Sequence, residues 1–279
     1  MNTTDDTLTY VYAAAPLTKD LRDAAAGLRG IYGSPVLLLT AGPTAAQPPL
    51  AFAASHVPHR DFNEHALKNH FEDLDWLENV ARAHHDVVQT LSLHTTVLPL
   101  RMATVYQDDD RARQALAEQH DALSERLAQL IGHTEFGVKI YLAAAPPDTG
   151  PAADAGAATT PGKAYLQRRR AQHSAQEAAY DQARRAAAAI ETTASRYAAQ
   201  RVRHPTQSGA LTGPAENVLN DAYLVAHAYA EQFQAAIAEA AGVLDGIRVE
   251  VTGPWAPYSF AMPPAERQNT ATGEEERTP

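Results

Sequence analysis

Several short, mostly apolar stretches in the first half of this chain, separated by glycine- and proline-containing segments, are typical of β-strands. They predict strands at residues 8–13, 36–40, 50–57 and 97–105. Pro99 indicates an edge or bulged position in the last of these, because proline has no N–H to donate to a neighbouring strand. Arg101 lies within the same apolar stretch and must reach solvent or pair with a carboxylate.

Helical periodicity separates these strands. An Ala-rich stretch predicts a helix at 18–28, and apolar residues at three- and four-residue steps predict a long amphipathic helix at 61–92 (Leu74, Leu77, Val80, His84, Val87 and Leu91). Three consecutive aspartates at 108–110 favour the start of a further helix, 108–131. The order β-α-β-β-α-β, followed by an extra helix, predicts a ferredoxin-like α+β domain over residues 1–134.

The second half repeats this order. We predict strands at 136–142, 201–204, 218–226 and 246–252, a long helix at 163–200, and a helix that contains Tyr229 and Phe233 and ends at Gly242. A modified ferredoxin-like domain is therefore expected at 135–262, with an unusually long first helix. Its Ala-, Pro- and Gly-rich stretch 143–162 is expected to be a flexible insertion, and the polar tail 263–279 to be disordered.

An aromatic segment follows the last predicted strand. Gly253 and Pro254 are expected to end strand pairing, and Trp255, Tyr258 and Phe260 then place three of the chain's few aromatic residues within six positions. This segment is suited to packing against a surface. That surface is either its own domain or a binding partner.

Composition limits the class of protein. The chain has 45% hydrophobic and 20% charged residues, no apolar run long enough to span a bilayer and no visible signal peptide. The absence of cysteine fits a cytoplasmic protein.

Net charge is −10, yet residues 163–203 hold nine basic and three acidic residues, a local net charge of +6. Within them, Arg168, Arg169 and Arg170 form a solvated face, a patch for an acidic protein partner or for the acidic first domain, or, with little aromatic support, a nucleic-acid site.

Candidate chemistry is sparse. Five of the twelve histidines lie in one predicted helical region, but without the i, i+3 or i, i+4 spacing of helical metal ligands (His65, His70, His84, His85 and His94). The carboxylates around Trp76 are typical of a solvated helix face, and no Gly-rich phosphate loop or nucleophile motif occurs. We therefore predict no catalytic, cofactor-binding or metal-binding residues.

Five strings occur in one order: FEDLDWLENVARAHHDVV (71–88), VLPLRMATVYQDDDR (97–111), FGVKIYL (136–142), AYLQRRR (164–170), and NVLNDAYLV (217–225) leading to TGPWAPYSF (252–260). Together they resemble the GvpF/GvpL family of gas vesicle proteins, over roughly residues 8–261. The F and the L type fit these strings equally. The resemblance implies a non-enzymatic, two-domain α+β protein of the bacterial or archaeal cytoplasm, located at gas vesicles and without a cofactor. Its partners would be the hydrophobic gas vesicle shell protein and other accessory proteins during assembly, with no nucleic acid and no lipid membrane.

The residues proposed to bind these partners are Trp255, Tyr258 and Phe260, with Arg168, Arg169 and Arg170 as electrostatic contacts. A shell subunit that is insoluble in water needs its apolar surface and strand edges covered before it polymerises. Two rival hypotheses are a small-molecule sensor that uses a cleft between the two ferredoxin-like domains and an enzyme that uses the histidine-rich helix.

Overall fold

The computed structural model describes residues 7–41, 49–70, 72–142, 161–206, 216–242 and 246–261. The chain divides into two units. The first contains the described residues up to Glu135 together with those from Trp255 onward, and the second runs from Phe136 to Pro254. The tail at 263–279 and most of the insertion at 143–162 lie outside the described residues.

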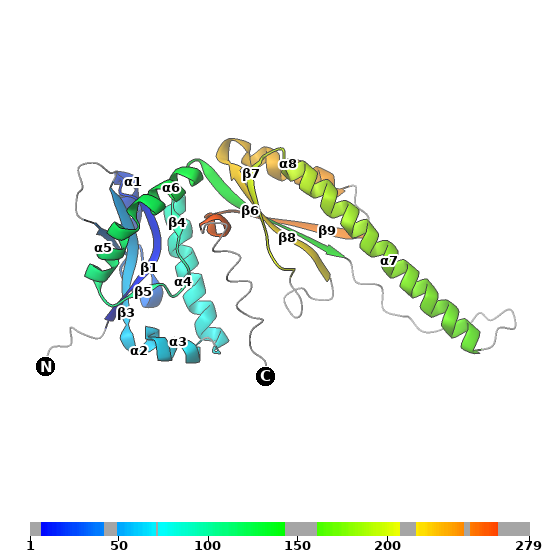
Figure 1. Ribbon diagram of the computed structural model, residues 1–279, viewed down its shortest axis with the longest axis horizontal. Coiled ribbons are helices and arrows are strands. Elements are labelled where there is room, and N and C mark those ends of the chain that lie inside the picture. The colour runs from blue at the N-terminus through cyan, green and yellow to red at the C-terminus, as the bar shows by residue number, and fades with distance from the viewer. Residues whose placement is uncertain are drawn as a thin grey trace. The chain divides into compact units, whose positions relative to one another are not determined.

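The first unit is built on an antiparallel sheet with the strand order β2-β3-β1-β4, in which β5 also pairs with β1 (Figure 1). Its elements are β1 (Thr7–Pro16), α1 (Lys19–Ala25), β2 (Leu37–Thr40), β3 (Leu50–Pro58), α2 (His59–Phe62), α3 (Glu64–His70), α4 (Leu74–Ser92), β4 (Leu98–Pro99), β5 (Val105–Tyr106), α5 (Asp109–Glu118) and α6 (His120–Leu130).

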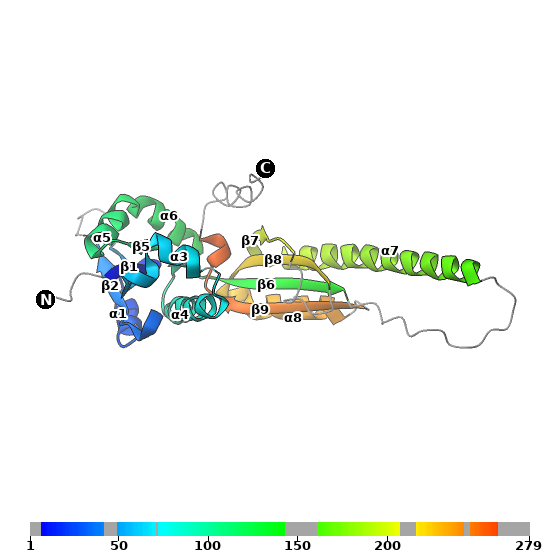
Figure 2. The same cartoon turned by 90° about the horizontal axis from the view of Figure 1, so that it is seen from below.

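Helices cover both faces of this sheet. Figure 2 shows α1 and α4 on one side of the strands and α5 and α6 on the other. Tyr10 and Tyr12 of β1 are fully buried and belong to the core that Val87 and Leu91 of α4 complete. Successive side chains of β1 point to opposite faces of the sheet. Tyr10 and Tyr12 pack on the face that α1 and α4 cover, and the buried residues Ala112 and Leu116 of α5 lie on the opposite face.

Two predicted helices of the first unit are interrupted. The helix expected at 61–92 is three helices, and Asp73 caps the last one by accepting the Trp76 N–H at 3.1 Å. The helix expected at 108–131 breaks at Gln119 between α5 and α6.

The strand expected at 97–105 is wrong over most of its length. Pro99 pairs with Ala13, and Val105 pairs with Tyr10, so residues 100–104 stand opposite only two residues of β1. They form a loop in which Ala103 has φ +62°. Arg101 lies in this loop and is exposed, which agrees with the high free-energy cost of burying a guanidinium in a strand.

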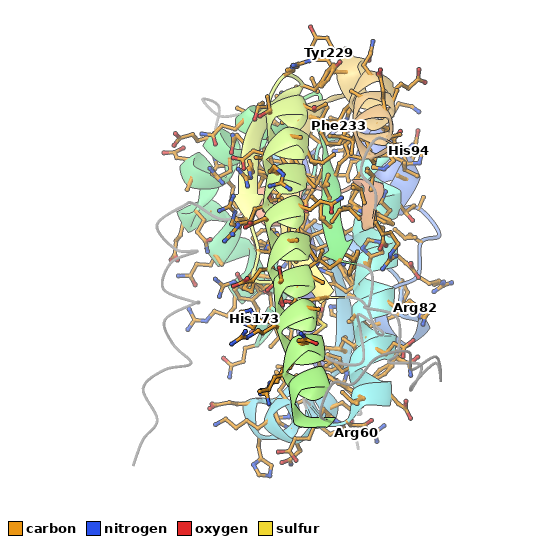
Figure 3. The ribbon with its side chains drawn as sticks, turned by 90° about the vertical axis from the view of Figure 1, so that its right-hand side faces the viewer. Arg60, Arg82, His94, His173, Tyr229 and Phe233 are labelled. Atoms are coloured by element: carbon orange, nitrogen blue, oxygen red, sulfur yellow. The ribbon has the colours of Figure 1, made fainter. Side chains whose placement is uncertain are left out.

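The second unit has a four-stranded sheet with the order β7-β8-β6-β9. Its elements are β6 (His133–Leu142), α7 (Pro161–Ala194), β7 (Ala198–Arg203), β8 (Glu216–Ala226), α8 (Ala230–Gly242) and β9 (Ile247–Trp255). Ile190 of α7 and Ile237 of α8 belong to one core together with the strand residues Phe136 and Val138. Both helices therefore cover one face of the sheet (Figure 1), and Figure 3 shows Phe233 of α8 beside α7.

Two boundaries differ from the sequence prediction in the second unit. Helix α7 ends at Ala194 rather than near 200, because the following residues pair with β8 in the strand β7. Arg201 of β7 forms ion pairs with Glu191 near the end of α7 and with the buried Asp221 of β8. These ion pairs link the edge strand to α7 and β8. At the other edge, β9 continues through Gly253 and Pro254 to Trp255, where strand pairing was expected to stop.

Candidate functional site

The aromatic segment Trp255–Phe260 is attached to the first unit through its backbone. Four side chains of that unit form hydrogen bonds with it. Thr134 Oγ1 donates to the Trp255 carbonyl (2.9 Å), and Gln89 Oε1 accepts the Ala256 N–H (3.0 Å). Glu135 accepts both the N–H and the hydroxyl of Ser259 (2.8 and 2.7 Å), and Arg126 donates to the Phe260 carbonyl (2.6 Å). The segment was expected within a second domain at 135–262, but it groups with the first unit.

The three aromatic residues have different environments. Phe260 is 1% exposed, whereas Trp255 is 38% exposed. Tyr258 is half-buried, and its hydroxyl is covered from solvent without a hydrogen bond among the described residues. Of the residues proposed from the sequence, Trp255 is therefore open to a partner and Phe260 is part of the interior.

Helix α4 supplies the surface beneath the segment. His85 contacts the Trp255 ring edge-on at 5.4 Å between ring centroids and stacks on Tyr258 at 6.0 Å. The neighbouring His84 is buried and pairs through Nδ1 with the Tyr10 hydroxyl at 2.9 Å. Burial lowers the pKa of His84 to about 4, so the ring is neutral near pH 7.

Two further titratable groups are shifted by the same burial. It raises the pKa of the Glu135 carboxyl, an effect that the two hydrogen bonds from Ser259 oppose. Burial, and secondly the charge of Glu135, raise the pKa of the Tyr258 hydroxyl, which keeps its proton. The Ser259 hydroxyl and N–H both donate to the Glu135 carboxylate, so this pair of residues holds the segment in place.

A cavity of about 430 Å³ lies in the first unit between the loop after β4 and the helix α6. Its walls are formed by apolar and cationic side chains, among them Phe52, Leu98, Leu123, Arg101, Arg126 and Tyr258. Tyr258 thus links the aromatic segment to this cavity. An apolar wall with a few polar groups is the usual character of a ligand or peptide pocket.

The arginines proposed from the sequence belong to the second unit. Arg169 and Arg170 are exposed on α7, while the side chain of Arg168 lies outside the described part of the structure. The histidine-rich region is dispersed, with His84 in the core and His94 exposed. In the described ranges, no three histidine, aspartate or glutamate side chains are grouped so as to hold a metal ion. None of the described helices combines the length and apolar character that a membrane span requires.

Sequence reasoning missed the groups that hold the aromatic segment. Gln89, Arg126 and Glu135 contact residues 124 to 167 positions away. Each is an ordinary polar residue on an amphipathic helix or a strand. No local pattern distinguishes them from solvated neighbours, so a single sequence carries no signal for them.

The same fold occurs in two solved structures. GvpF from Anabaena sp. PCC7120 aligns with a TM-score of 0.60 at 17% identity, covering 92% of this chain and 97% of that one. GvpF from Microcystis aeruginosa aligns with a TM-score of 0.60 at 18% identity, covering 92% and 99%. The class is therefore a mixed α/β protein with antiparallel sheets, of the kind seen in these gas vesicle proteins.

Sequence comparison identifies the family. Residues 8–262 match the family described as gas vesicle synthesis protein GvpL/GvpF. Gas vesicle protein L of Streptomyces sp. (strain CB03234) is 41% identical over 261 residues, which are 92% of this chain and 93% of the relative. This chain belongs to the GvpL/GvpF family, as the five strings indicated, and membership implies a role in gas vesicle formation.

Proposed function

We propose that this protein binds the hydrophobic gas vesicle shell protein, and other accessory proteins, while gas vesicles form in the cytoplasm. The family match over residues 8–262 carries this proposal. The proposed role is non-catalytic and needs no cofactor, nucleic acid or lipid membrane. The protein covers the apolar surface of a shell subunit until that subunit is added to the vesicle.

The proposed contact surface lies on the first unit and joins Trp255 to the cavity beside Tyr258. Trp255 is partly exposed, and Tyr258, three residues further on, lines a pocket with apolar walls. Such a surface suits an apolar protein segment, because aromatic residues commonly dominate binding energy at interfaces. The exposed arginines of α7, at 169 and 170, are proposed as electrostatic contacts for an accessory protein. Phe260 supports the surface from inside.

We also propose that both units are ferredoxin-like. The elements of the second unit follow the order β-α-β-β-α-β, and its sheet order places the first and third strands side by side in the centre. The main strands of the first unit have the corresponding order, with β1 and β3 in the centre. If both units have this topology, each has free sheet edges to which a partner could add a strand.

Co-expression with the shell protein tests the contact surface. We expect Trp255→Ala to weaken capture of the shell protein by about thirtyfold, since a buried interface tryptophan contributes on the order of 2 kcal/mol. Ala122→Arg should act similarly, because Ala122 is exposed and lines the cavity, so the larger side chain fills it without removing core contacts.

Tyr229→Ala is the matched control, because Tyr229 is a surface aromatic residue of the second unit, 53% exposed. It should capture shell protein as the wild type does. Unchanged capture by folded Trp255→Ala and Ala122→Arg proteins would remove this surface from the interface. Failure of the wild-type chain to retain shell protein would reject the proposed function itself.

A further inference from the structure

The first half of α7 extends beyond the sheet that its second half covers (Figures 1 and 2). The fully buried residues described on this helix are Ala183, Ala186, Ile190 and Ala194, all in its C-terminal half. From Leu166 to Ala178, every described side chain is exposed. A helical segment of about 12 to 15 residues is only marginally stable in water without packing, so this half offers an ordered surface for which a partner would supply packing.

One face of this exposed half combines an apolar side chain with cations. Leu166, Arg169, Arg170 and His173 are spaced at i, i+3, i+4 and i+7, and such residues share a helix face. Leu166 is 58% exposed, and His173 projects from the helix in Figure 3. We call these four residues the basic face.

The charges of the two units are unequal. The first unit contains twelve basic and 22 acidic residues, a net charge of −10, whereas the second contains eleven of each. An anionic first unit would be repelled by nucleic acid and by anionic lipid. It would attract the basic face of another molecule.

A surface complementary to the basic face occurs at the start of α4. Leu74 is 76% exposed and is surrounded in sequence by the exposed carboxylates of Glu72, Asp73, Asp75 and Glu78. We call these five residues the acidic start of α4. It presents an exposed leucine with anions, where the basic face presents an exposed leucine with cations.

We propose that the basic face of α7 in one molecule binds the acidic start of α4 in a second molecule of the same protein. The two surfaces differ, so the contact is heterologous and each bound molecule keeps one free surface of each kind. Association therefore continues head to tail. Exposed ion pairs contribute at most about 1 kcal/mol each, so the contact is weak, depends on protein concentration and is sensitive to salt.

Sedimentation velocity of the purified full chain, over a range of concentrations, tests this. We expect association at about 0.1 M salt, where the Debye length is about 10 Å, and its loss at about 1 M salt, where that length is about 3 Å. Arg169→Glu/Arg170→Glu should abolish association, as should Glu72→Arg/Asp75→Arg. Asp73 is left unchanged because it caps α4.

Charge exchange makes the test specific. A mixture of the two double variants should associate again, and so should one chain that carries all four substitutions, because opposite charges then face each other. Arg185→Glu/Arg196→Glu changes the net charge equally at exposed positions outside the basic face and should associate like the wild type.

Three results would overturn the proposal: a monomeric wild type at all concentrations, unchanged association of either double variant, or no recovery in the mixture. The measurement uses no shell protein. Its failure therefore leaves the proposed function unaffected, and failed shell capture leaves this inference unaffected.

Discussion

Trp255, Tyr258 and Phe260 show how far individual residues could be interpreted from the sequence. Their concentration within six positions after a strand predicted a segment that packs against a surface, and the segment does pack. Which of the three is buried depends on Arg126, Glu135 and α4, which are distant in sequence. The aromatic character could therefore be predicted, but the exposed fraction of each ring could not.

His84 gives a prediction at this scale. Burial lowers its pKa to about 4, and its Nδ1 is hydrogen-bonded to the Tyr10 hydroxyl, which also accepts the Ala103 N–H. We expect the NMR titration midpoint of the His84 ring near 4, with a His84→Gln variant identifying the resonance by its loss. A midpoint near the ordinary value of about 6.5 would contradict the buried, neutral ring.

The sign of the linked stability change follows from the same shift. Between about pH 6.5 and 4 the unfolded chain binds a proton that folded His84 excludes, so this residue makes the fold less stable as the pH falls through that window. At about 1.4 kcal/mol per pKa unit the change is on the order of 3 kcal/mol. The His84→Gln variant should lack this contribution in urea unfolding at pH 7 and pH 4.

Among the elements, regular periodicity was the reliable guide. The strands β6 and β8 lie where alternation predicted them, and β1 and β3 lie where short, mostly apolar stretches predicted them. The errors occur where tertiary contacts decide. Residues 198–200 have the composition of a helix but pair with β8, and residues 100–104 have the composition of a strand but form a loop around Arg101. Local propensity is a weak prior at such positions.

Helix α7 offers a matched comparison within one element. Ile190 is fully buried in the core of the second unit, whereas Leu166 is 58% exposed on the same helix. We expect Ile190→Ala to lower the free energy of unfolding by about 2 to 5 kcal/mol, through lost burial and a cavity. Leu166→Ala should change it by less than about 0.5 kcal/mol. Urea unfolding measures both values, and similar losses would mean that the exposed half of α7 packs on the chain.

For the whole molecule, the return of the chain to its first unit is the organising feature. The sequence order suggested two consecutive domains, and the structure instead ends with residues Trp255 onward on the first unit. Ala256 is 1% exposed and belongs to the core of Tyr10 and Leu91. The hydrophobic core of the first unit is therefore complete only when the last described residues are included. The first 135 residues alone would not indicate this.

This arrangement predicts which unit each of two phenylalanines stabilises. Phe260 is buried in the first unit and Phe233 in the second, so truncating either to alanine should destabilise its own unit by about 3 to 5 kcal/mol. In hydrogen–deuterium exchange, Phe260→Ala should speed exchange in β1, β3 and α4 and leave β6 and β8 unchanged, although residue 260 follows β9 in the chain. Phe233→Ala should do the reverse. Faster exchange in β6 and β8 of the Phe260→Ala protein would show that the segment stabilises the unit it follows in sequence.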